Sequence, residues 1–388
     1  MSEALKPAMT HAAATEVADR LAARARWGPA EIGFWLIALG SIFLLPSKHL
    51  ILTEIAILAL FALSLDLILG YAGIVSLGHA AFFGFGAYVA ALLAKHQIVT
   101  EPVLALIIAG LGSTILGFLT SFLVLRGSDL TRLMVTLGVA LLLREVANQM
   151  SWLTGGTDGL QGVSVEPVVG LFQFDLYGRT GYIYSLVVFF ILFMIARRIV
   201  NSPFGLSLQS LRSNPLRAAA IGIPVNRRLI AIYTIAAGYA GIAGGLLAQT
   251  TAFASMDGFS FERSADVLLV LIIGGTGYLY GGPIGAIVFK LMQDWLAILT
   301  PQYWHFWIGL VLVMMVLFGR VYGLAIAALI LAIALKLNLS FFECIAITLL
   351  IGLARNPIID AIKLVERRVV RLARRFGPLP KFRLRPEP

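Results

Sequence analysis

The chain has 388 residues, of which 59% are hydrophobic and 13% are charged, and its mean hydropathy is +0.91. Soluble globular chains are about half apolar and a quarter charged, so this composition excludes an ordinary soluble protein and indicates one built for lipid. The single cysteine, Cys344, excludes an internal disulfide.

The formal net charge is +10, and much of it lies near the C-terminal end. From Arg355 onward, ten basic residues face three acidic ones, directly after an apolar segment. Membrane proteins place such basic stretches on the cytoplasmic side, close to anionic lipid headgroups. The tail therefore favours membrane lipids as its partner, and we expect no nucleic-acid partner.

The hydrophobic pattern predicts an all-α protein, a polytopic transmembrane helical bundle of about ten core spans, because a span needs about 20 apolar residues. Residues 1–31 form a cytoplasmic N-terminal segment, and residues 32–320 hold the spans. We expect the spans at approximately 32–46, 49–69, 71–94, 102–125, 131–150, 181–196, 229–253, 265–280, 283–299 and 303–318. Two further apolar runs in residues 321–354 form an additional hairpin of spans, or one of them lies along the surface. Residues 355–388 form a basic cytoplasmic tail.

The loops between the spans differ in charge, which predicts the orientation of the chain. The connection 197–228 carries six arginines and no acid, whereas the connection 151–180 carries three acids and one arginine. Basic loops stay in the cytoplasm, so the first connection lies inside and the second outside. Counting spans from there places both termini of this multi-pass protein in the cytoplasm, and we expect the membrane to be a bacterial inner membrane.

Glycine gathers in three clusters within the apolar segments, at Gly70–Gly86, Gly238–Gly245 and Gly274–Gly285. In the second cluster the spacings of three and four residues favour close helix packing. The other two clusters break helices, and backbone freed at membrane depth is tolerated where protein or a water-filled cavity satisfies it. Close packing remains the alternative for them too. The candidate pathway residues in these two clusters are Gly73, Ser76, Gly78, His79, Gly84, Tyr88, Gly275, Gly277, Gly282 and Pro283.

Ionisable residues inside spans are expected to have a structural or functional role, because their burial in lipid is costly. Arg144 and Glu145 are adjacent, so they point to different faces of a helix and do not simply pair with each other. Either they line the pathway or brace an interface near Asn148, or they extend towards the outer surface. His79 is more often a satisfied interior histidine than a ligand or a proton carrier.

Other ionisable residues in spans are read from their spacing. Lys290 and Asp294 stand at i, i+4 and predict a structural pair, while Glu54 and Asp66 have no partner close in sequence.

Motifs for covalent chemistry are absent from the sequence. There is no G-x-x-x-x-G-K-[ST] loop for ATP, no H-E-x-x-H helix or Cys/His cluster for a metal, and no G-x-S-x-G elbow for acyl transfer. We therefore expect no catalytic residues, no metal site and no cofactor in this chain, which disfavours a membrane enzyme.

The basic loop 202–223 contains helix-compatible stretches punctuated by proline and glycine. On physical grounds it is either an ordinary cytoplasmic loop or a docking element for a cytoplasmic partner. The stretch Gly70–Leu93, the loop Leu153–Gly159, this loop and the segment Gly274–Gly285 occur in the same order as in the permeases of branched-chain amino acid ABC importers. The chain resembles that family over roughly residues 50–320 and is most similar to its M-type subunit.

The resemblance implies partners and sites. It implies a second, H-type permease subunit, two cytoplasmic ABC ATPases that use ATP and magnesium, and an extracytoplasmic solute-binding protein. The loop that couples to the ATPases would contain Arg212, Asn214, Arg217, Ala218, Ala220, Gly222 and Ile223. The binding protein would contact Thr154, Gly155, Gly156, Asp158 and Gly159. Family members commonly carry acidic residues where this chain has Ser213 and Pro215, which leaves the electrostatics of the ATPase dock open.

The resulting expectation is a permease that imports branched-chain or related amino acids by alternating access between inward-open and outward-open packings. The alternative is an ion-coupled secondary transporter or channel for a small solute that works without an ATPase. In that case Glu54, Asp66 and Glu145 would carry the ion coupling.

Overall fold

The computed structural model describes residues 27–319, except 126, 128, 169 and 176, together with Ile330. Within these residues the chain is helical and has no β-strand, and its two isolated bridges join Leu160 to Ala254 and Val168 to Phe172. The all-α prediction is therefore confirmed for this part of the chain. The predicted hairpin 321–354 and the basic tail 355–388 lie outside the described residues, Ile330 apart.

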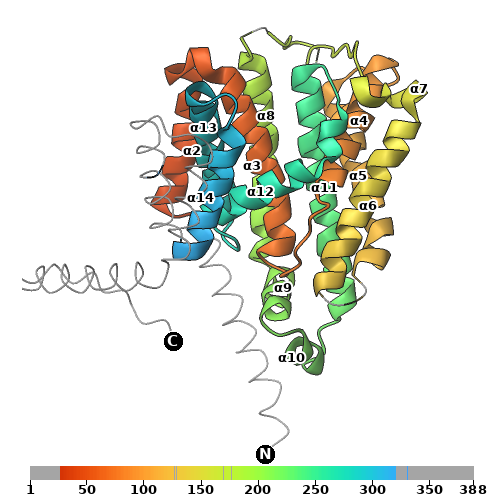
Figure 1. Ribbon diagram of the computed structural model, residues 1–388, viewed down its shortest axis with the longest axis vertical. Coiled ribbons are helices and arrows are strands. Elements are labelled where there is room, and N and C mark those ends of the chain that lie inside the picture. Colours follow the sequence, from red (N-terminus) through yellow and green to blue (C-terminus); the bar gives the residue numbers. More distant parts are fainter. Residues whose placement is uncertain are drawn as a thin grey trace, which may run out of the picture. The chain divides into compact units, whose positions relative to one another are not determined.

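The chain forms two compact units, residues 1–291 and 292–388, and each is described by itself. The helices of the first unit, shown in Figure 1, are α2 (Pro29–Leu44), η1 (Pro46–Lys48), α3 (His49–Leu69), α4 (Ala80–Lys95), α5 (Pro102–Val124), α6 (Asp129–Gln149), α7 (Ser151–Thr154), η2 (Gly156–Asp158), α8 (Arg179–Val200), α9 (Pro203–Ser213), α10 (Pro215–Ala220), α11 (Val225–Thr251), η3 (Met256–Phe259) and α12 (Phe261–Gly274). Helix α13 (Gly281–Leu299) begins in the first unit and ends in the second, which also holds α14 (Trp304–Phe318).

Five helical segments are long and apolar enough to cross a membrane. They are Pro46–Leu69, which joins η1 to α3, and the helices α5, α8, α11 and α13. Helices α2 and α4 and most of α14 are apolar but shorter. A multi-pass membrane protein is therefore supported, whereas the total of about ten spans stays a prediction, as do the domain boundaries.

Proline and short polar side chains set where several helices begin. Proline occupies the first turn of α2, α5, α9 and α10, where the missing N–H costs nothing. The Ser202 hydroxyl accepts from the Gly205 N–H (3.4 Å) to cap α9, and the side-chain oxygen Oδ1 of Asn214 accepts from the Arg217 N–H (3.0 Å) to cap α10. The basic loop of the sequence is therefore two short consecutive helices.

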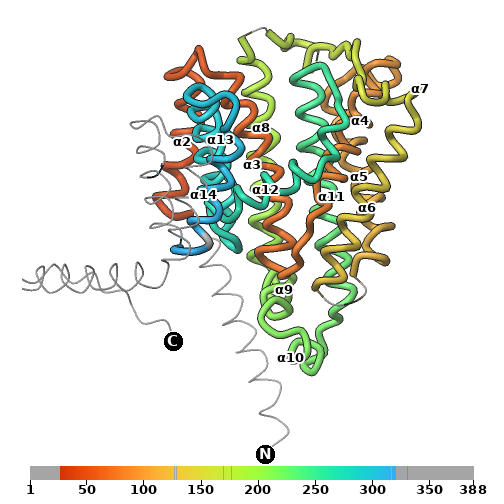
Figure 2. Tube along the Cα trace, viewed as in Figure 1, coloured from red at the N-terminus to blue at the C-terminus, as the bar shows by residue number. Residues whose placement is uncertain are grey.

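Helices α3 and α11 form the centre of the first unit. Helix α3 is buried over most of its length and lies against α8, α11 and α12, as a helix that is apolar on all sides requires. Helix α11 lies beside α3, α4 and α5, and the chain trace in Figure 2 shows it among them. Glycine brings α4 and α11 close together, because a Cβ atom at Gly86 would fall on the Gly241 carbonyl and one at Gly244 on the Phe83 carbonyl.

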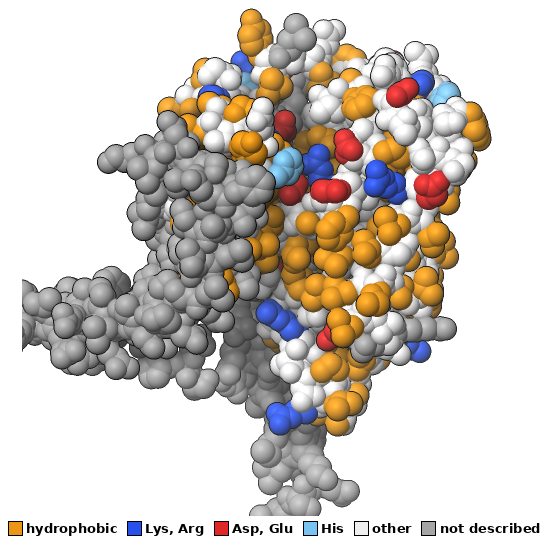
Figure 3. Space-filling view, in the orientation of Figure 1, with side chains coloured by type: hydrophobic (Ala, Val, Ile, Leu, Met, Phe, Trp, Pro, Cys, Tyr) orange, Lys and Arg blue, Asp and Glu red, His pale blue; other side chains and the backbone are white. Residues whose placement is uncertain are grey.

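The surface of the first unit carries an apolar band. Figure 3 shows this band on the side where α6 and α12 lie, with charged side chains above and below it. The exposed apolar side chains of α6 include Leu130, Met134, Leu141 and Leu142. Such a band is what a surface in contact with hydrocarbon, or with another membrane subunit, requires.

We predict that Gly244→Ala lowers the thermal unfolding temperature of the purified chain in detergent. Its Cβ atom has no room beside the Phe83 carbonyl, so α4 and α11 must separate, at a cost of about 1–3 kcal/mol. The matched control is Gly138→Ala in α6, where no heavy atom lies within 4 Å of the added Cβ. That variant is expected to unfold at the wild-type temperature or above it, and equal losses in the two variants would contradict the close packing of α4 on α11.

Candidate functional site

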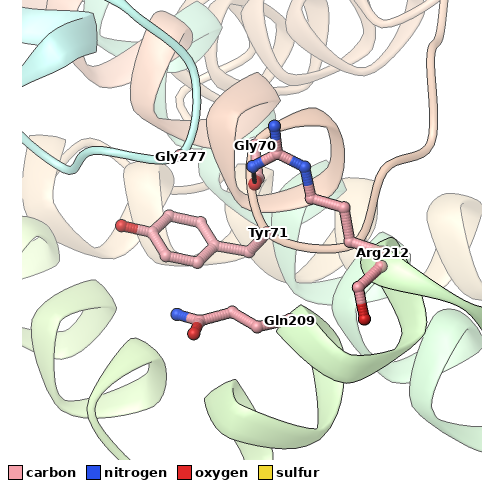
Figure 4. Close-up of a pocket in the computed structure, with 6 residues that line it drawn as sticks. Gly70, Tyr71, Gln209, Arg212 and Gly277 are labelled. Atoms are coloured by element: carbon pink, nitrogen blue, oxygen red, sulfur yellow. Dashed lines mark hydrogen bonds between the residues drawn. The ribbon is translucent and has the colours of Figure 1, made fainter. Parts of the chain in front are cut away.

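Three segments that are far apart in sequence meet at one point of the first unit, which we call the junction. The segments are the C-terminal end of α3 with Gly70 and Tyr71, the last turns of α9, and the loop between α12 and α13. A pocket of about 400 Å³ opens there, and Figure 4 shows residues from all three segments around it. Its lining residues are Gly70, Tyr71, Gln209, Arg212, Ser213 and Gly277.

Arg212 reaches from the last turn of α9 to the end of α3. Its guanidinium donates a hydrogen bond to the Gly70 carbonyl, as drawn in Figure 4. The last carbonyls of a helix lack partners within the helix and carry partial negative charge, so a cation stabilises them. Gly73, with φ +75°, lies against the stem of the same side chain, and a Cβ there would be 3.1 Å from Arg212 Cγ.

Asp66 lies one turn before Gly70 in α3 and is completely buried. Its Oδ1 accepts a hydrogen bond of 2.7 Å from the Gly277 N–H, whereas its Oδ2 has no hydrogen-bond partner among the described residues. The positive charge of Arg212 lies close enough to interact with this carboxylate. A buried carboxylate is costly unless charge and hydrogen bonds compensate it, so Arg212 and Gly277 together hold Asp66.

Glycine is required at two positions for the segments to come this close. A Cβ atom at Gly70 would fall on Asp66 Oδ1 and on the Gly277 nitrogen. At Gly277 it would lie 2.6 Å from an Arg212 nitrogen, and the φ of +79° disfavours any other residue. The structure thus brings two predicted pathway residues, Gly73 and Gly277, together with Arg212 of the predicted coupling loop, and adds Gly70 and Asp66.

The remaining candidates after α3 are packed into protein away from the junction pocket. The His79 Nε2 is 2.8 Å from the Ser64 hydroxyl and the ring stacks on Phe61, while Nδ1 has no hydrogen-bond partner in the described part of the chain. Ser76, also buried, has no hydrogen-bond partner for its hydroxyl there either. Gly78 lies against the Thr136 carbonyl.

Two further candidates of this cluster lie in α4, beside η3. A Cβ at Gly84 would meet the Phe259 ring, and Tyr88 packs on the same ring with centroids 5.6 Å apart.

The candidates between α12 and α13 shape the loop that carries Gly277. Gly275 adopts a φ of +107°, and a Cβ on Gly281 would fall on the Gly275 carbonyl. Gly282 lies against the backbone of Ala62 and Leu63 in α3, and Pro283 is buried beside it. This loop is therefore held against α3 at both of its ends.

Helix α6 carries Arg144, Glu145 and Asn148 outside the junction. The side chains of Arg144 and Glu145 are exposed, and Glu145 accepts a hydrogen bond of 2.7 Å from Gln149. The opposite face of the helix, with Leu143 and Ala147, packs on the apolar cluster around η3. With 21 residues α6 is as long as α3, yet it is not among the helices apolar enough to cross a membrane.

Lys290 in α13 has a partner far from it in sequence. Its Nζ lies 2.5 Å from Glu54 Oε2 in α3. The predicted pairing of Lys290 with Asp294 stays a prediction.

The loop of α9 and α10 presents an exposed apolar surface. Arg217 and Ala220 are exposed, Ala218 is completely buried, and Ile223 is half-buried. Gly222 has a φ of +87° and open space around it. Leu216 and Ile221, which are not among the predicted site residues, are 83% and 74% exposed. Nothing in their sequence spacing distinguishes these two residues from the buried Ala218 between them.

The predicted binding-protein loop is compact and rich in left-handed glycines. Thr154 donates to the Ala147 carbonyl (2.7 Å), and the φ angles of Gly155, Gly156 and Gly159 are +79°, +60° and +74°. Asp158 is exposed.

Asp175, near the end of the same connection, stabilises the start of α8. Slight burial raises the pKa of Asp175, but the N–H groups of Thr180 and Arg179 donate to its carboxylate and bring the pKa below its ordinary value. In the described part of the chain, no three His, Cys, Asp or Glu side chains gather as metal ligands would.

Known proteins resemble this chain in sequence. The model of the family described as "Branched-chain amino acid transport system / permease component" matches residues 49–318. The high-affinity branched-chain amino acid transport system permease protein LivM of Escherichia coli (strain K12) is 28% identical over 270 residues, 63% of each chain. The probable branched-chain amino acid transport permease protein LivH of Methanocaldococcus jannaschii is 25% identical over 61% of this chain and 76% of its own. The fructose import permease protein FrcC of Rhizobium meliloti is 25% identical over 74% and 81%.

The chain spans 63% of the length of the LivM relatives that it matches. No solved structure matches it. The family model covers residues 49–318, well over half of the chain and including every segment of the junction. The chain therefore belongs to the family of branched-chain amino acid transport system permease components.

Proposed function

We propose that this chain is a membrane-spanning permease subunit of an ATP-driven ABC importer for branched-chain or related amino acids. The ATPases, the solute-binding protein and a second permease subunit are supplied by other chains. The observation that carries the proposal is the junction, where Arg212 of the α9–α10 loop holds the end of α3 beside the α12–α13 loop. A partner that moves this loop displaces both segments together, as alternating access requires.

In this proposal, the free energy of ATP binding in the partner reaches this chain through the exposed apolar surface at α10. Leu216 and Ile221 are too exposed to stabilise the subunit itself, and an apolar surface of this kind marks a contact with another protein. In the proposed importer this partner is an ATPase. Ser213 and Pro215 contribute no acidic charge there, so the dock depends on apolar contact more than on ion pairs.

The pathway runs along α6 in this proposal. An exposed face with Arg144, Glu145 and Gln149 is costly against hydrocarbon, whereas it suits a polar pathway or another subunit. The second permease subunit covers this face and completes the pathway. The loop of Thr154 to Gly159, which follows α6 in sequence, contacts the binding protein.

The substrate assignment rests on relatives. LivM is named for branched-chain amino acid transport and is more similar to this chain than FrcC, which is named for fructose import. An amino acid is therefore the proposed substrate.

An ion-coupled secondary transporter is the second candidate, and the buried Asp66 carboxylate is the observation that favours it. The three acids that would carry the ion do not form a chain. Asp66 binds Gly277, Glu54 pairs with Lys290, and Glu145 is exposed on α6. The ATP-driven importer accounts for Arg212 and for the surface of α10, which the ion-coupled transporter leaves unused.

Reconstitution in vesicles separates the two candidates. We expect uptake of radiolabelled leucine only when this chain is combined with its partner permease, its ATPases, its binding protein and ATP. Uptake by this chain alone, driven by an ion gradient and indifferent to ATP, would show that the importer proposal is wrong.

A second prediction concerns the α10 dock. Leu216→Asp places a charge in the proposed contact and should weaken ATPase association by about tenfold or more, as expected for a central apolar contact. Association is measured by co-purification and by titration with the labelled ATPase. The control is Leu171→Asp in the 155–178 loop, where Leu171 is 77% exposed. If the two variants bind the ATPase equally well, α10 is not the dock.

A third prediction concerns transmission through the junction. Arg212→Gln removes the cation from the end of α3, so the peptides covering residues 66–73 and 274–278 should exchange their amide hydrogens faster. ATPase binding and ATP hydrolysis should persist while uptake falls at least several-fold.

The matched control is Arg217→Gln, because Arg217 is exposed on α10 and no residue of the junction pocket contacts it through a described hydrogen bond. That variant should leave the exchange at the junction unchanged. Wild-type exchange and uptake in Arg212→Gln would refute the proposed transmission.

A further inference from the structure

A groove separate from the junction lies at the C-terminal end of α8. It has a volume of about 610 Å³ and runs between α8 and Trp27, two residues before α2. Its lining includes Trp27, Phe190, Ile191, Met194, Arg198 and Asn201, none of which lines the junction pocket.

The chemistry of the groove changes along its length. Phe190, Met194 and Arg198 follow one another at intervals of four residues, so they form a single stripe on α8. The first two turns of this stripe are apolar, and Ile191 and Ile195 beside them are 52% and 44% exposed. The next turn is cationic, and Asn201 and Ser202 complete the polar end. From Ile191 to Arg198 the groove extends by about 10 Å along the helix.

The two arginines at the polar end, Arg197 and Arg198, differ in the contacts that their side chains make. Arg197 is buried, pairs with Glu31 at 2.7 Å and lies over the Trp27 ring at 4.8 Å from its centroid. These contacts fix Trp27 as the wall opposite α8. Arg198 is exposed and makes no ion pair or hydrogen bond with any described residue. One cation at the mouth of the groove is therefore left without a counter-ion from the described protein.

We propose that this groove binds an anionic phospholipid, with the phosphate at Arg198 and Asn201 and an acyl chain along Phe190, Ile191 and Met194. Helix α8 is apolar enough to cross a membrane and Arg198 stands two residues before its end, so the polar end of the groove lies at the depth of lipid headgroups. A free phosphate would leave the apolar stripe unfilled, and an acyl chain covers it.

The two parts of the groove contribute differently to recognition. Acyl chains are as well solvated by the bilayer as by leucine or isoleucine, so the apolar stripe supplies shape and little affinity. Selection among lipids is left to the charge at Arg198, supported by the N-terminus of the 11-residue helix α9 beside Ser202. One basic residue near an anionic headgroup contributes about 1 kcal/mol, which corresponds to about a fivefold preference for anionic over zwitterionic lipid.

The test uses the full chain in mixed bilayers with photoactivatable phosphatidylglycerol or phosphatidylethanolamine that carry the reactive group in the same acyl chain. Cross-links are mapped by peptide mass spectrometry, which separates the groove peptide 187–202 from lipid gathered by the basic tail. We expect phosphatidylglycerol to label this peptide about five times more than phosphatidylethanolamine, and Arg198→Gln to abolish the difference.

Two further variants and one competitor complete the test. Arg179→Gln, at the other end of α8 and also exposed, should keep the preference. Ile191→Trp, which fills the groove from an exposed position, should lower labelling by both lipids. Unchanged labelling in Arg198→Gln or in Ile191→Trp would overturn the proposal. So would loss of the preference in excess inorganic phosphate, because the site would then bind a free anion.

Discussion

The organisation of the first unit depends on one requirement, the compensation of polar groups where helices end inside an apolar protein. Helix α3 ends at Leu69, so the Gly70 carbonyl needs a partner outside the helix, and Asp66 sits fully buried one turn earlier. Arg212 donates to the Gly70 carbonyl, and its charge also stabilises the Asp66 carboxylate. The Gly277 N–H donates to Asp66 Oδ1. These polar contacts join three segments that are distant in sequence.

Glycine makes this arrangement sterically possible and also organises the rest of the unit. At the junction, Gly70 and Gly277 bring backbone to within reach of the Asp66 carboxylate, which no side chain larger than hydrogen would permit. Gly86 of α4 and Gly244 of α11 bring these two helices together with almost no side chain between the backbones. The first use joins a loop to a helix end, and the second joins two long helices. Glycine is thus used both at the junction, which moves in the proposed cycle, and in the contact of α4 with α11, which stays fixed.

The fold class and the main segments could be predicted from the sequence, because apolar runs of the length of α5, α8 and α11 have few other solutions in a chain of this composition. The basic connection 197–228 was also recognisable, because six arginines without an acid are a strong local signal, whereas its role in coupling stays a prediction. The partners of Asp66 and Glu54 were not. Gly277 is 211 residues from Asp66, and Lys290 is still farther in sequence from Glu54, so no local spacing reveals either contact.

Exposure was the other quantity that the sequence did not reveal. Ala218 and Leu216 are two residues apart in α10, yet one is completely buried and the other is 83% exposed. The exposed fractions of these two residues depend on how α10 packs on its neighbours. The sequence pattern alone does not reveal that packing. The conformation of Gly222, by contrast, is local, and its place after a short helix is where glycine is favoured.

The composition of α6 has a consequence for how this protein is made. A helix enters the bilayer from the translocon according to its own hydrophobicity, and α6 falls short of the neighbours that are apolar enough to cross alone. As a predicted span, α6 therefore relies for its insertion on α4 and α5, against which it packs and which leave the ribosome before it. In the proposed importer, the newly made chain carries Arg144 and Glu145 at a surface that lipid solvates poorly until the second permease subunit covers it. Assembly with that subunit would then be a step of biogenesis, and the chain made without it should be short-lived in the cell.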